Sequence, residues 1–354
     1  MKNQIGLTLV LILVAATGGW GASHIGLPMP YMLGGLGLVA AVVLAMPGAL
    51  FQAYDFPEPL RRGFVALVGA LIGAGFSPAL FSALGTVWIS FLAVILFIGI
   101  AQTVNFVLYR RIAGYDRATA FYAAMPGGLV EAAILGEAAG GDARILTIQH
   151  FVRITLTILL VPLLFLAISG EAVGSSAGQT LDPTDPNLWD IGVIGFIALA
   201  GLSLGNYVRI PAKHFILPLL LSAGLHAGGI VETAPPGWLI ESAQVVIGAS
   251  LGARFAGVTP GLLARAFGMG LLSVSVMLMI GAGFALVLSH LIAEPIPILF
   301  ISFAPGGVTE MSLIALSLSA NPVFVSAHHL FRITVTVFVS GLLARAFGVG
   351  VTPK

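Results

Sequence analysis

Two sets of polar residues stand out because the second repeats the first at a constant separation of 179 positions. The first set comprises Pro126, Gly127, Gly128, Glu131, His150, Arg153 and Thr157. The second set comprises Pro305, Gly306, Gly307, Glu310, His329, Arg332 and Thr336. Carboxylate, imidazole and guanidinium groups in an apolar chain can bind ions or relay protons. The segment 126–157 therefore has an internal duplicate at 305–336, and both copies could carry chemistry of this kind.

Each Pro-Gly-Gly segment is expected to break a helix, because proline lacks an N–H donor and glycine is costly in a helix interior. A helix that begins after the second glycine presents free N–H groups and the positive end of its dipole, which favour an anion or a carboxylate. We therefore predict that residues 126–128 and 305–307 line a substrate site. The alternative is a sharp turn that allows close helix packing.

Glu131 and Glu310 follow the second glycine by three residues and so lie in the first turn of the new helix. An acid at this position is stabilised by the helix dipole and can cap the N-terminus. A carboxylate at membrane depth is costly, however, and often belongs to an ion or proton pathway. We predict an ion-coupling role for both residues, with capping or ion pairing as the alternative.

Arg153 and Arg332 share a helix face with the His three residues before them and the Thr four residues after them. Counted from the helix starts, both Arg residues lie about 12 to 14 Å into the bilayer, where an unpaired Arg costs about 2.5 to 3.5 kcal/mol. Each Arg therefore needs a partner. One interpretation pairs each Arg with the Glu of its own set, and the other gives at least one Arg an anionic substrate.

The His and Thr residues of the two sets complete the predicted ion-coupling residues. His150 and His329 can relay protons, although a buried, hydrogen-bonded His is an equal alternative. His328 has Gln149 as its counterpart, so the adjacent His pair predicts no metal site. The sequence shows no catalytic triad, phosphate-binding loop or metal-ligand spacing, and we expect neither enzymatic activity nor a cofactor.

The composition places the chain in a membrane. Of its 354 residues, 58% are hydrophobic and 8% are charged, and the mean hydropathy is +1.07. A single soluble core could not accommodate this composition without large exposed apolar patches. The formal net charge of +1 gives no nucleic-acid footprint, and the lack of cysteine in the sequence excludes disulfides and thiolate chemistry.

Apolar runs follow one another in two sets of six. The first set lies at about 5–21, 27–46, 64–80, 86–109, 118–139 and 145–169. The second set lies at about 191–208, 214–231, 238–257, 267–290, 295–319 and 323–347. A polar stretch rich in Gly, Ser, Pro and Asp separates them. We predict a first membrane repeat at 1–169, an external linker at 170–189 and a second membrane repeat at 190–354.

Weaker echoes extend the duplication over nearly the whole chain. Leu27 and Pro28 match Ile210 and Pro211, and Gly73 matches Gly252. The run at 5–21 could pass for a secretory signal, but the run at 191–208 occupies the same place in the second repeat. We therefore predict that the first run is a retained transmembrane helix.

Positive charge indicates whether the Pro-Gly-Gly runs cross the bilayer. With twelve spans, Lys and Arg outside the helices divide as eight cytoplasmic against five external. With ten spans and two re-entrant loops, all thirteen fall on the cytoplasmic side, as the positive-inside rule requires. Each arm of such a loop, about ten residues, is also too short for a ~30 Å core. We predict an all-α integral membrane protein of two inverted repeats, each with five transmembrane helices and a re-entrant Pro-Gly-Gly hairpin, and cytoplasmic termini.

The pattern Pro-Gly-Gly-x-x-Glu followed by His-x-x-Arg-Ile-Thr, present twice, resembles the AbrB family of bacterial membrane proteins. The resemblance covers nearly the whole chain and implies a duplicated membrane domain. The layout is also similar to that of citrate and glutamate symporters with re-entrant loops, which implies a homodimer. Some members of the AbrB family are called ammonia monooxygenases, but copper or iron oxygen chemistry needs a His or His-carboxylate cluster that this sequence lacks. Others are called regulators of gene expression, and here such an effect would be indirect because the sequence has no basic soluble domain.

The expected function is therefore that of a bacterial inner-membrane secondary transporter. It would move a small anionic or zwitterionic solute by alternating access, coupled to H⁺ or Na⁺. The expected partners are the solute, the coupling ion and lipid, without nucleic acid. The alternative is a membrane-embedded regulator or sensor that affects gene expression indirectly.

Overall fold

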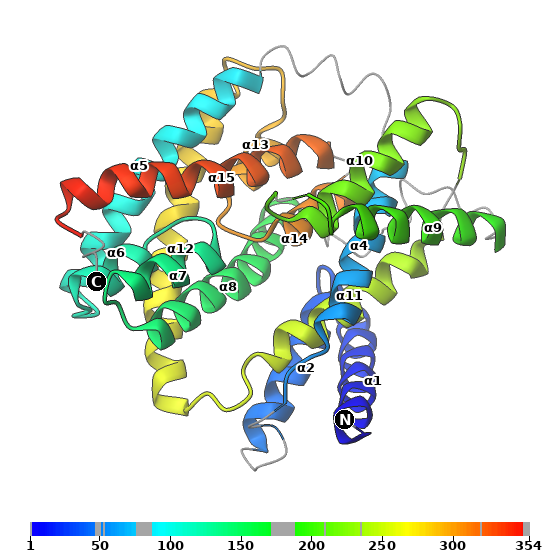
Figure 1. Cartoon of the computed structure of the whole chain (residues 1–354), viewed down its shortest axis with the longest axis horizontal. Helices are drawn as coiled ribbons and strands as arrows, with labels where there is room; N and C mark the ends of the chain where they lie inside the picture. The colour runs from blue at the N-terminus through cyan, green and yellow to red at the C-terminus, as the bar shows by residue number, and fades with distance from the viewer. Residues whose placement is uncertain are drawn as a thin grey trace. The chain divides into compact units, whose positions relative to one another are not determined.

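The computed structural model describes residues 2–46, 51, 54–75, 87–170, 188–208, 210–233, 236–318 and 321–349. Within these ranges all regular secondary structure is helical, which confirms the predicted all-α class (Figure 1). Most of the predicted linker at 170–189 lies outside the described residues.

The helices follow the predicted apolar runs in order. Those of the first predicted repeat are α1 (Lys2–His24), α2 (Pro30–Ala45), α4 (Glu58–Ala74), α5 (Val87–Arg111), α6 (Arg117–Ala123), α7 (Leu129–Ala138) and α8 (Ala143–Ser169). Those of the second are α9 (Leu188–Leu204), α10 (Lys213–Ala227), α11 (Gly237–Ala253), α12 (Pro260–Leu288), α13 (Ile296–Phe303), α14 (Val308–Ser317) and α15 (Pro322–Ala346). Each run that contains Pro-Gly-Gly forms two short helices, α6–α7 and α13–α14, instead of one long helix.

Five helical segments in the described part of the chain are long and apolar enough to cross a bilayer. They are Gln4–His24, Val87–Arg111, Ala143–Ile168, Pro260–Leu288 and Pro322–Ala346. Several such helices indicate a multi-pass membrane protein. The other five predicted spans are helices of 15 to 17 residues, so the count of ten spans stays a prediction.

The chain divides into two compact units, and each unit combines parts of both predicted repeats. Unit 1 comprises Met1–Phe81, Leu159–Thr259 and Ser312–Val323. Unit 2 comprises Ser82–Ile158, Pro260–Met311 and Phe324–Lys354. The predicted boundaries at 169 and 190 separate sequence repeats, whereas the compact units interleave the two repeats.

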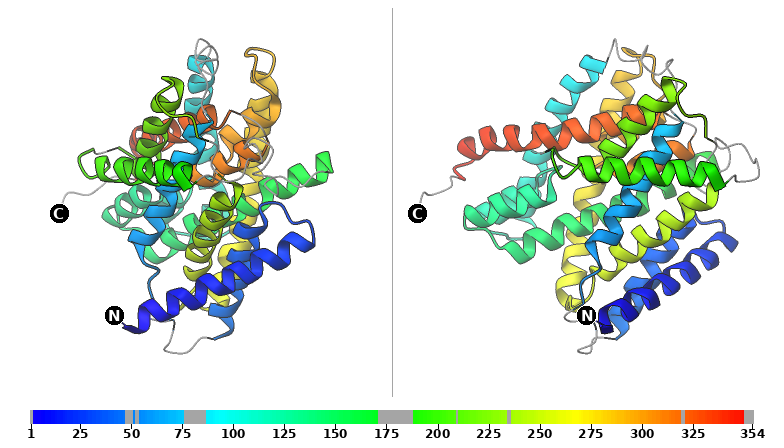
Figure 2. Two further views of the ribbon diagram at one scale, coloured as in Figure 1. Left: turned by 90° about the vertical axis from the view of Figure 1, so that its right-hand side faces the viewer. Right: turned by 45° about the vertical axis from the view of Figure 1, so that its right-hand side comes forward.

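In unit 1, the main helix contacts occur in equivalent pairs when the two repeats are compared. Helix α1 packs on α2, as Figure 2 shows, and α9 packs on α10. Helix α2 packs on α11 just as α10 packs on α4, and α1 touches α11 just as α9 touches α4. Helices α4 and α11 pack on each other. Exchanging the two repeats therefore leaves these helix pairings unchanged.

Equivalent glycines make close contacts on α4 and α11 of unit 1. A Cβ on Gly73 of α4 would lie 2.7 Å from the Cβ of Ser222 on α10, and a Cβ on Gly252 of α11 would lie 2.8 Å from the Cβ of Val39 on α2. One turn earlier, Gly69 and Gly248 face backbone carbonyls of the same two partner helices. Small residues four apart let helix backbones approach closely, so these positions exclude larger side chains.

The weaker sequence echoes mark equivalent helix starts in unit 1. Met29 and Ala212 precede α2 and α10 with left-handed φ values of 46° and 50°. Both directly follow the matched prolines. A left-handed conformation costs a non-glycine residue about 1 to 2 kcal/mol, so its occurrence at both equivalent positions indicates a shared backbone arrangement.

Unit 2 contains both copies of the polar motif. In this unit, helices of one repeat contact helices of the other. Helix α6 packs on α5 and α13 packs on α12, and α5 and α12 contact each other. Aromatic pairs support these contacts, with ring centroids 6.1 Å apart for Phe106 and Phe121 and 5.4 Å apart for Phe284 and Phe303. Polar bonds join α5 to α15, the last helix of the other repeat, through Ser340 and Gln102 at 2.7 Å.

Candidate functional site

Both Pro-Gly-Gly turns are buried within unit 2, between a short helix that ends and a short helix that begins. Helix α6 ends before Pro126 and α7 begins after Gly128, while α13 ends before Pro305 and α14 begins after Gly307. Residues 126–128 and 305–306 are buried, and Gly307 is half-buried. The helix break predicted at each Pro-Gly-Gly is therefore present.

The two His residues bind carbonyl groups at the ends of the interrupted helices. The Nε2 atom of His150 lies 2.9 Å from the carbonyl oxygen of Tyr122, and that of His329 lies 3.0 Å from the carbonyl oxygen of Ile301. A carbonyl only accepts, so Nε2 is the donor in both bonds. Each His is fully buried and gives a second hydrogen bond to a carbonyl that also accepts a backbone N–H at the helix C-terminus.

The two Arg residues bind the carbonyl that directly precedes Pro-Gly-Gly in each copy. The Nη1 group of Arg153 donates to the carbonyl of Met125, and that of Arg332 donates to the carbonyl of Ala304. His and Arg are three residues apart on α8 and on α15, and the carbonyls they bind are also three residues apart. The His-x-x-Arg spacing thus matches the three-residue spacing of the two carbonyls that His and Arg bind before each Pro-Gly-Gly turn.

The two Thr residues complete the shared set of bonds. The hydroxyl of Thr157 donates to the carbonyl of Arg153 at 2.8 Å, and that of Thr336 donates to the carbonyl of Arg332 at 2.6 Å. Bonds of this kind, from a Thr hydroxyl to the carbonyl four residues earlier, keep a buried hydroxyl satisfied within its own helix. Every bond of this set occurs in both copies.

Further bonds of Arg332 are absent at Arg153. Its Nη2 group donates to the carbonyl of Gly306 at 2.9 Å and lies 2.9 Å from Nδ1 of His329, while Nη1 also contacts the carbonyl of Phe303 at 3.4 Å. In the part of the chain that the structure describes, Arg153 bonds only Met125, and Nδ1 of His150 has no partner. The two copies therefore share the same basic hydrogen bonds but differ in how many of the Arg and His nitrogens are bonded.

The carboxylates lie close to the glycines that start their own helices. A Cβ on Gly128 would be 3.0 Å from Oε2 of Glu131, and Glu310 covers Gly307 in the same way. Neither acid forms an ion pair with Arg153 or Arg332 among the described residues. The structure therefore does not show the Glu–Arg pairs that were one interpretation of the sequence. Glu131 is half-buried and Glu310 is buried.

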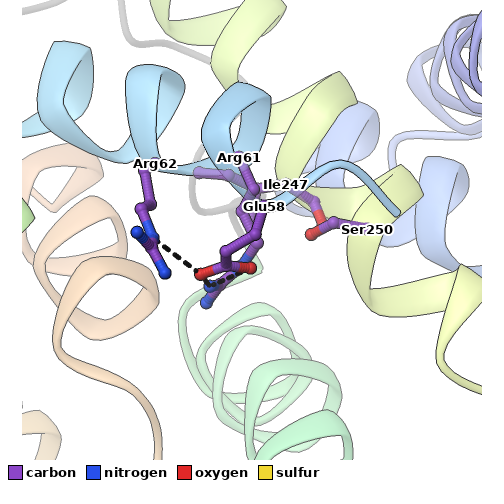
Figure 3. A network of polar contacts seen from close by, with 5 residues as sticks. All are labelled: Glu58, Arg61, Arg62, Ile247 and Ser250. Carbon is purple, nitrogen blue, oxygen red and sulfur yellow. Dashed lines mark hydrogen bonds and ion pairs between the residues drawn. The ribbon is translucent and has the colours of Figure 1, made fainter. Parts of the chain in front are cut away.

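Ion pairs do occur in unit 1, at the start of α4. Glu58 accepts from Arg61 at 3.1 Å and from Arg62 at 3.2 Å (Figure 3). All three side chains are partly exposed there. The contrast is informative, because the two partly exposed Arg residues have a carboxylate whereas the two buried ones do not.

The polar residues of the two copies come together within unit 2. A Cβ on Gly127 would lie 3.2 Å from Oγ1 of Thr336 and 3.4 Å from Cα of Ile333, so the first turn packs against α15 of the other repeat. Arg153 and Arg332 are also close enough to repel each other electrostatically. Turn, guanidinium groups and hydroxyls from both repeats thus form one region.

A family model described as "Transition state regulatory protein AbrB" matches residues 38–348 of the chain. The chain belongs to the AbrB family. It is 28% identical over 355 residues to the Bacillus subtilis (strain 168) protein named "Uncharacterized protein YhjN", an alignment that covers 93% of this chain and 90% of that protein. It is 24% identical over 345 residues to the Escherichia coli (strain K12) protein named "Putative regulator AbrB", with 97% and 96% covered. The resemblance inferred from the duplicated motif is confirmed.

This AbrB-family chain has further buried polar residues that the motif did not reveal. Gln149 donates to the hydroxyl of Tyr115 at 2.8 Å and accepts from Tyr109 at 3.4 Å. Its counterpart His328 lies 2.7 Å from the hydroxyl of Ser90. The position is polar in both repeats although the residue types differ, and that shared polarity was the available signal. These bonds anchor α8 and α15 next to the site.

Proposed function

We propose that this AbrB-family protein is a secondary transporter of the bacterial inner membrane. It moves a small anionic or zwitterionic solute by alternating access, coupled to H⁺ or Na⁺, and has no catalytic chemistry of its own. The supporting observation is the pair of buried guanidinium groups, since Arg153 and Arg332 are 3% and 1% exposed and have no carboxylate partner in the described residues. Carbonyl groups solvate these cations without neutralising them. A bound anion would supply the missing charge.

The two acids are the candidates for ion coupling. Glu131 and Glu310 each sit at a helix start, where free N–H groups and the helix dipole stabilise a negative charge. Neither carboxylate forms a hydrogen bond or ion pair with another described residue. A carboxylate of this kind can take up H⁺ or Na⁺ in one state of a transport cycle and release it in another.

The proposed arrangement in the membrane is that of two inverted repeats with re-entrant hairpins. Helices α7 and α14 have ten residues each. At 1.5 Å per residue each spans about 15 Å, roughly half of the hydrocarbon core. Broken backbone at this depth is tolerated only where protein or water satisfies it, and the bonds from His and Arg to the freed carbonyls fit that requirement. The positive-inside distribution supports ten spans with both termini in the cytoplasm.

A flux assay tests the transport proposal. Purified protein in proteoliposomes should accumulate a member of a broad panel of labelled small carboxylates and amino acids when a proton or sodium gradient is imposed. Glu131→Gln and Glu310→Gln should lower gradient-driven uptake about tenfold or more, because the amide cannot exchange a cation. Glu137→Gln is the matched control, since Glu137 is exposed on the same helix as Glu131. Absence of gradient-driven or exchange flux across the panel, with both Gln variants behaving as wild type in cells, would argue against a transporter.

Single-cysteine labelling tests the inverted topology, and the cysteine-free sequence gives no background. Asp142 and Asn321 are the equivalent N-terminal residues of α8 and α15, and their side chains accept from backbone N–H groups at 2.9 and 3.1 Å. Asp142→Cys and Asn321→Cys should react with a membrane-impermeant maleimide from opposite sides of oriented vesicles. Reaction of both from one side would contradict inverted repeats.

The alternative function is a membrane-embedded regulator or sensor. The description of the family and the name of the Escherichia coli relative favour it. A regulator would bind a ligand or capture a protein partner without moving solute. Ligand-dependent thermal stabilisation of the purified protein with no flux in proteoliposomes would favour this function over transport.

A further inference from the structure

The two copies of the site leave different hydrogen-bonding groups available for a ligand. Arg332 uses both of its terminal nitrogens, on three carbonyls and on His329, and only Nε remains. Arg153 uses only Nη1, so Nε and Nη2 have no partner among the described residues. Nε and Nη2 lie on the same edge of a guanidinium group. Together they form the fork that binds both oxygens of a carboxylate.

The neighbouring His residues differ in the same way, because His329 has all its ring nitrogens bonded and His150 does not. Each donates from Nε2 to a carbonyl, so the neutral ring carries a lone pair on Nδ1. At His329 that lone pair accepts from Arg332 at 2.9 Å. At His150 it is buried and has no partner in the described part of the chain. The same three-residue spacing places His150 and Arg153 one turn apart on the same face of α8, and there both Nδ1 of His150 and Nε of Arg153 are buried without a partner in the described residues.

We infer that Arg153 and His150 hold a carboxylate together with a hydrogen-bond donor on the adjacent carbon, so that the ligand is a small 2-hydroxy or 2-amino carboxylic acid. The carboxylate binds the Nε and Nη2 edge of Arg153, and the hydroxyl or ammonium group donates to Nδ1 of His150. Arg332 and His329 are positioning residues that hold the opposing half of the site closed. This inference rests on the proposed function only in treating the ligand as the transported solute.

The pairing also gives the site a basis for specificity. A buried acceptor that a ligand fails to satisfy keeps its desolvation penalty, so an acid without the adjacent donor is disfavoured. A matched acid fills both open positions and neutralises one of the two guanidinium charges. The ligand class therefore follows from one free fork and one free lone pair at neighbouring positions.

Binding of matched acids to the purified full-length protein in nanodiscs tests this inference. The panel contains 2-hydroxy and 2-amino acids of two to six carbons, each beside its unsubstituted parent, as in lactate and alanine against propionate. Isothermal titration should show at least one substituted acid binding about tenfold more tightly than its parent. Arg153→Gln should weaken binding of both about tenfold or more, because the charged fork is lost.

His150→Gln is the sharper variant. The glutamine amide can still donate to the carbonyl of Tyr122, but it offers no acceptor at the Nδ1 position. Binding of the parent acid should stay within about twofold of wild type, while the preference for the substituted acid falls to about one. A residue that only supports the fold would weaken both acids alike. If Arg153→Gln does not fold, the selectivity ratio of His150→Gln still decides the outcome.

Several results would overturn the inference. These are equal binding of substituted and parent acids, binding of no acid in the panel, or unchanged selectivity in His150→Gln. Measuring flux and binding on the same protein distinguishes a failure of this inference from a failure of the proposed function. Selective binding without flux would leave the ligand site standing and remove transport, whereas gradient-driven flux that is unchanged in Arg153→Gln would leave transport standing and remove the site.

Discussion

The glycine contacts of α4 and α11 in unit 1 are equivalent, whereas the hydrogen bonds around the two Pro-Gly-Gly turns of unit 2 are equivalent only in part. Gly73 faces α10 as Gly252 faces α2, and both partner helices begin after a left-handed residue. In unit 2, by contrast, Gly128 has a left-handed φ of 66° that Gly307 does not share. The turn with the left-handed glycine is the one whose Arg makes fewer bonds.

This difference follows from how each unit is held together. Where helix backbones touch through glycine, any side chain would force the helices apart, so neither repeat has room to diverge. A guanidinium group has five N–H donors and can satisfy them in several ways without a change of residue. Identical motif residues can therefore form different hydrogen bonds in the two repeats. The departure from equivalence lies where we propose that a ligand binds.

The largest effect should come from filling the glycine contacts of unit 1. Gly69→Ala and Gly248→Ala should each destabilise the protein by about 3 kcal/mol, because a methyl group would meet a backbone carbonyl and separate two helices. Thermal unfolding of the purified variants measures this loss. Gly63→Ala is the matched control on α4, since nothing lies within 4 Å of a Cβ there, and it should stabilise the helix by about 0.5 to 1 kcal/mol.

The equivalence of unit 1 is tested by comparing these two variants with each other. Equivalent contacts should give losses that agree within about 0.5 kcal/mol and that add in the double variant. A large loss in one variant and none in the other would show that the two repeats pack differently in unit 1 after all. The contrast with unit 2 would then disappear.

A smaller effect should appear in unit 2, and it should be unequal. Arg332→Lys removes several charge-assisted bonds to carbonyls and should cost about 2 kcal/mol, whereas Arg153→Lys removes one and should cost about 1 kcal/mol. Both variants keep the positive charge, so the comparison isolates the number of bonds. Melting temperatures in detergent without added ligand measure the difference. Equal losses of stability would mean that Arg153 and Arg332 form equally many hydrogen bonds to their turns in the protein.

Much of the fold could be predicted from the sequence. Apolar runs, with proline and glycine as punctuation, located the helices and both breaks, because length and helix-breaking residues act locally. The interleaving of the repeats into two units could not be predicted in this way. Helices that are apolar on all sides carry no periodic signal for which neighbour they meet. The matched glycines, such as Gly73 and Gly252, were the available signal for two of these contacts.

The candidate site was predictable in its shared part and not in its differences. The spacing of His150, Arg153 and Thr157 correctly placed them on one face, because helix geometry alone decides that. Their carbonyl partners were missed, since a break releases backbone acceptors that have no sequence signature. The unequal bonding of Arg153 and Arg332 could not be read from identical residues. It depends on the backbone of the turns, including the conformation of Gly128.

The smallest effect should come from removing the two Thr hydroxyls. This change tests whether Thr336 bonds only its own helix, as Thr157 does, or also the turn of the other repeat. Thr157→Val and Thr336→Val each remove a bond to the Arg carbonyl four residues earlier and should each cost about 1 kcal/mol. Thr336 also lies against Gly127 of the other repeat, and valine has nearly the same volume as threonine. Thermal unfolding should therefore show equal losses, with Thr334→Val on the exposed side of α15 close to wild type. A clearly larger loss for Thr336→Val would mean that its hydroxyl also bonds the first turn, which would make that turn less open than Arg153 and His150 indicate.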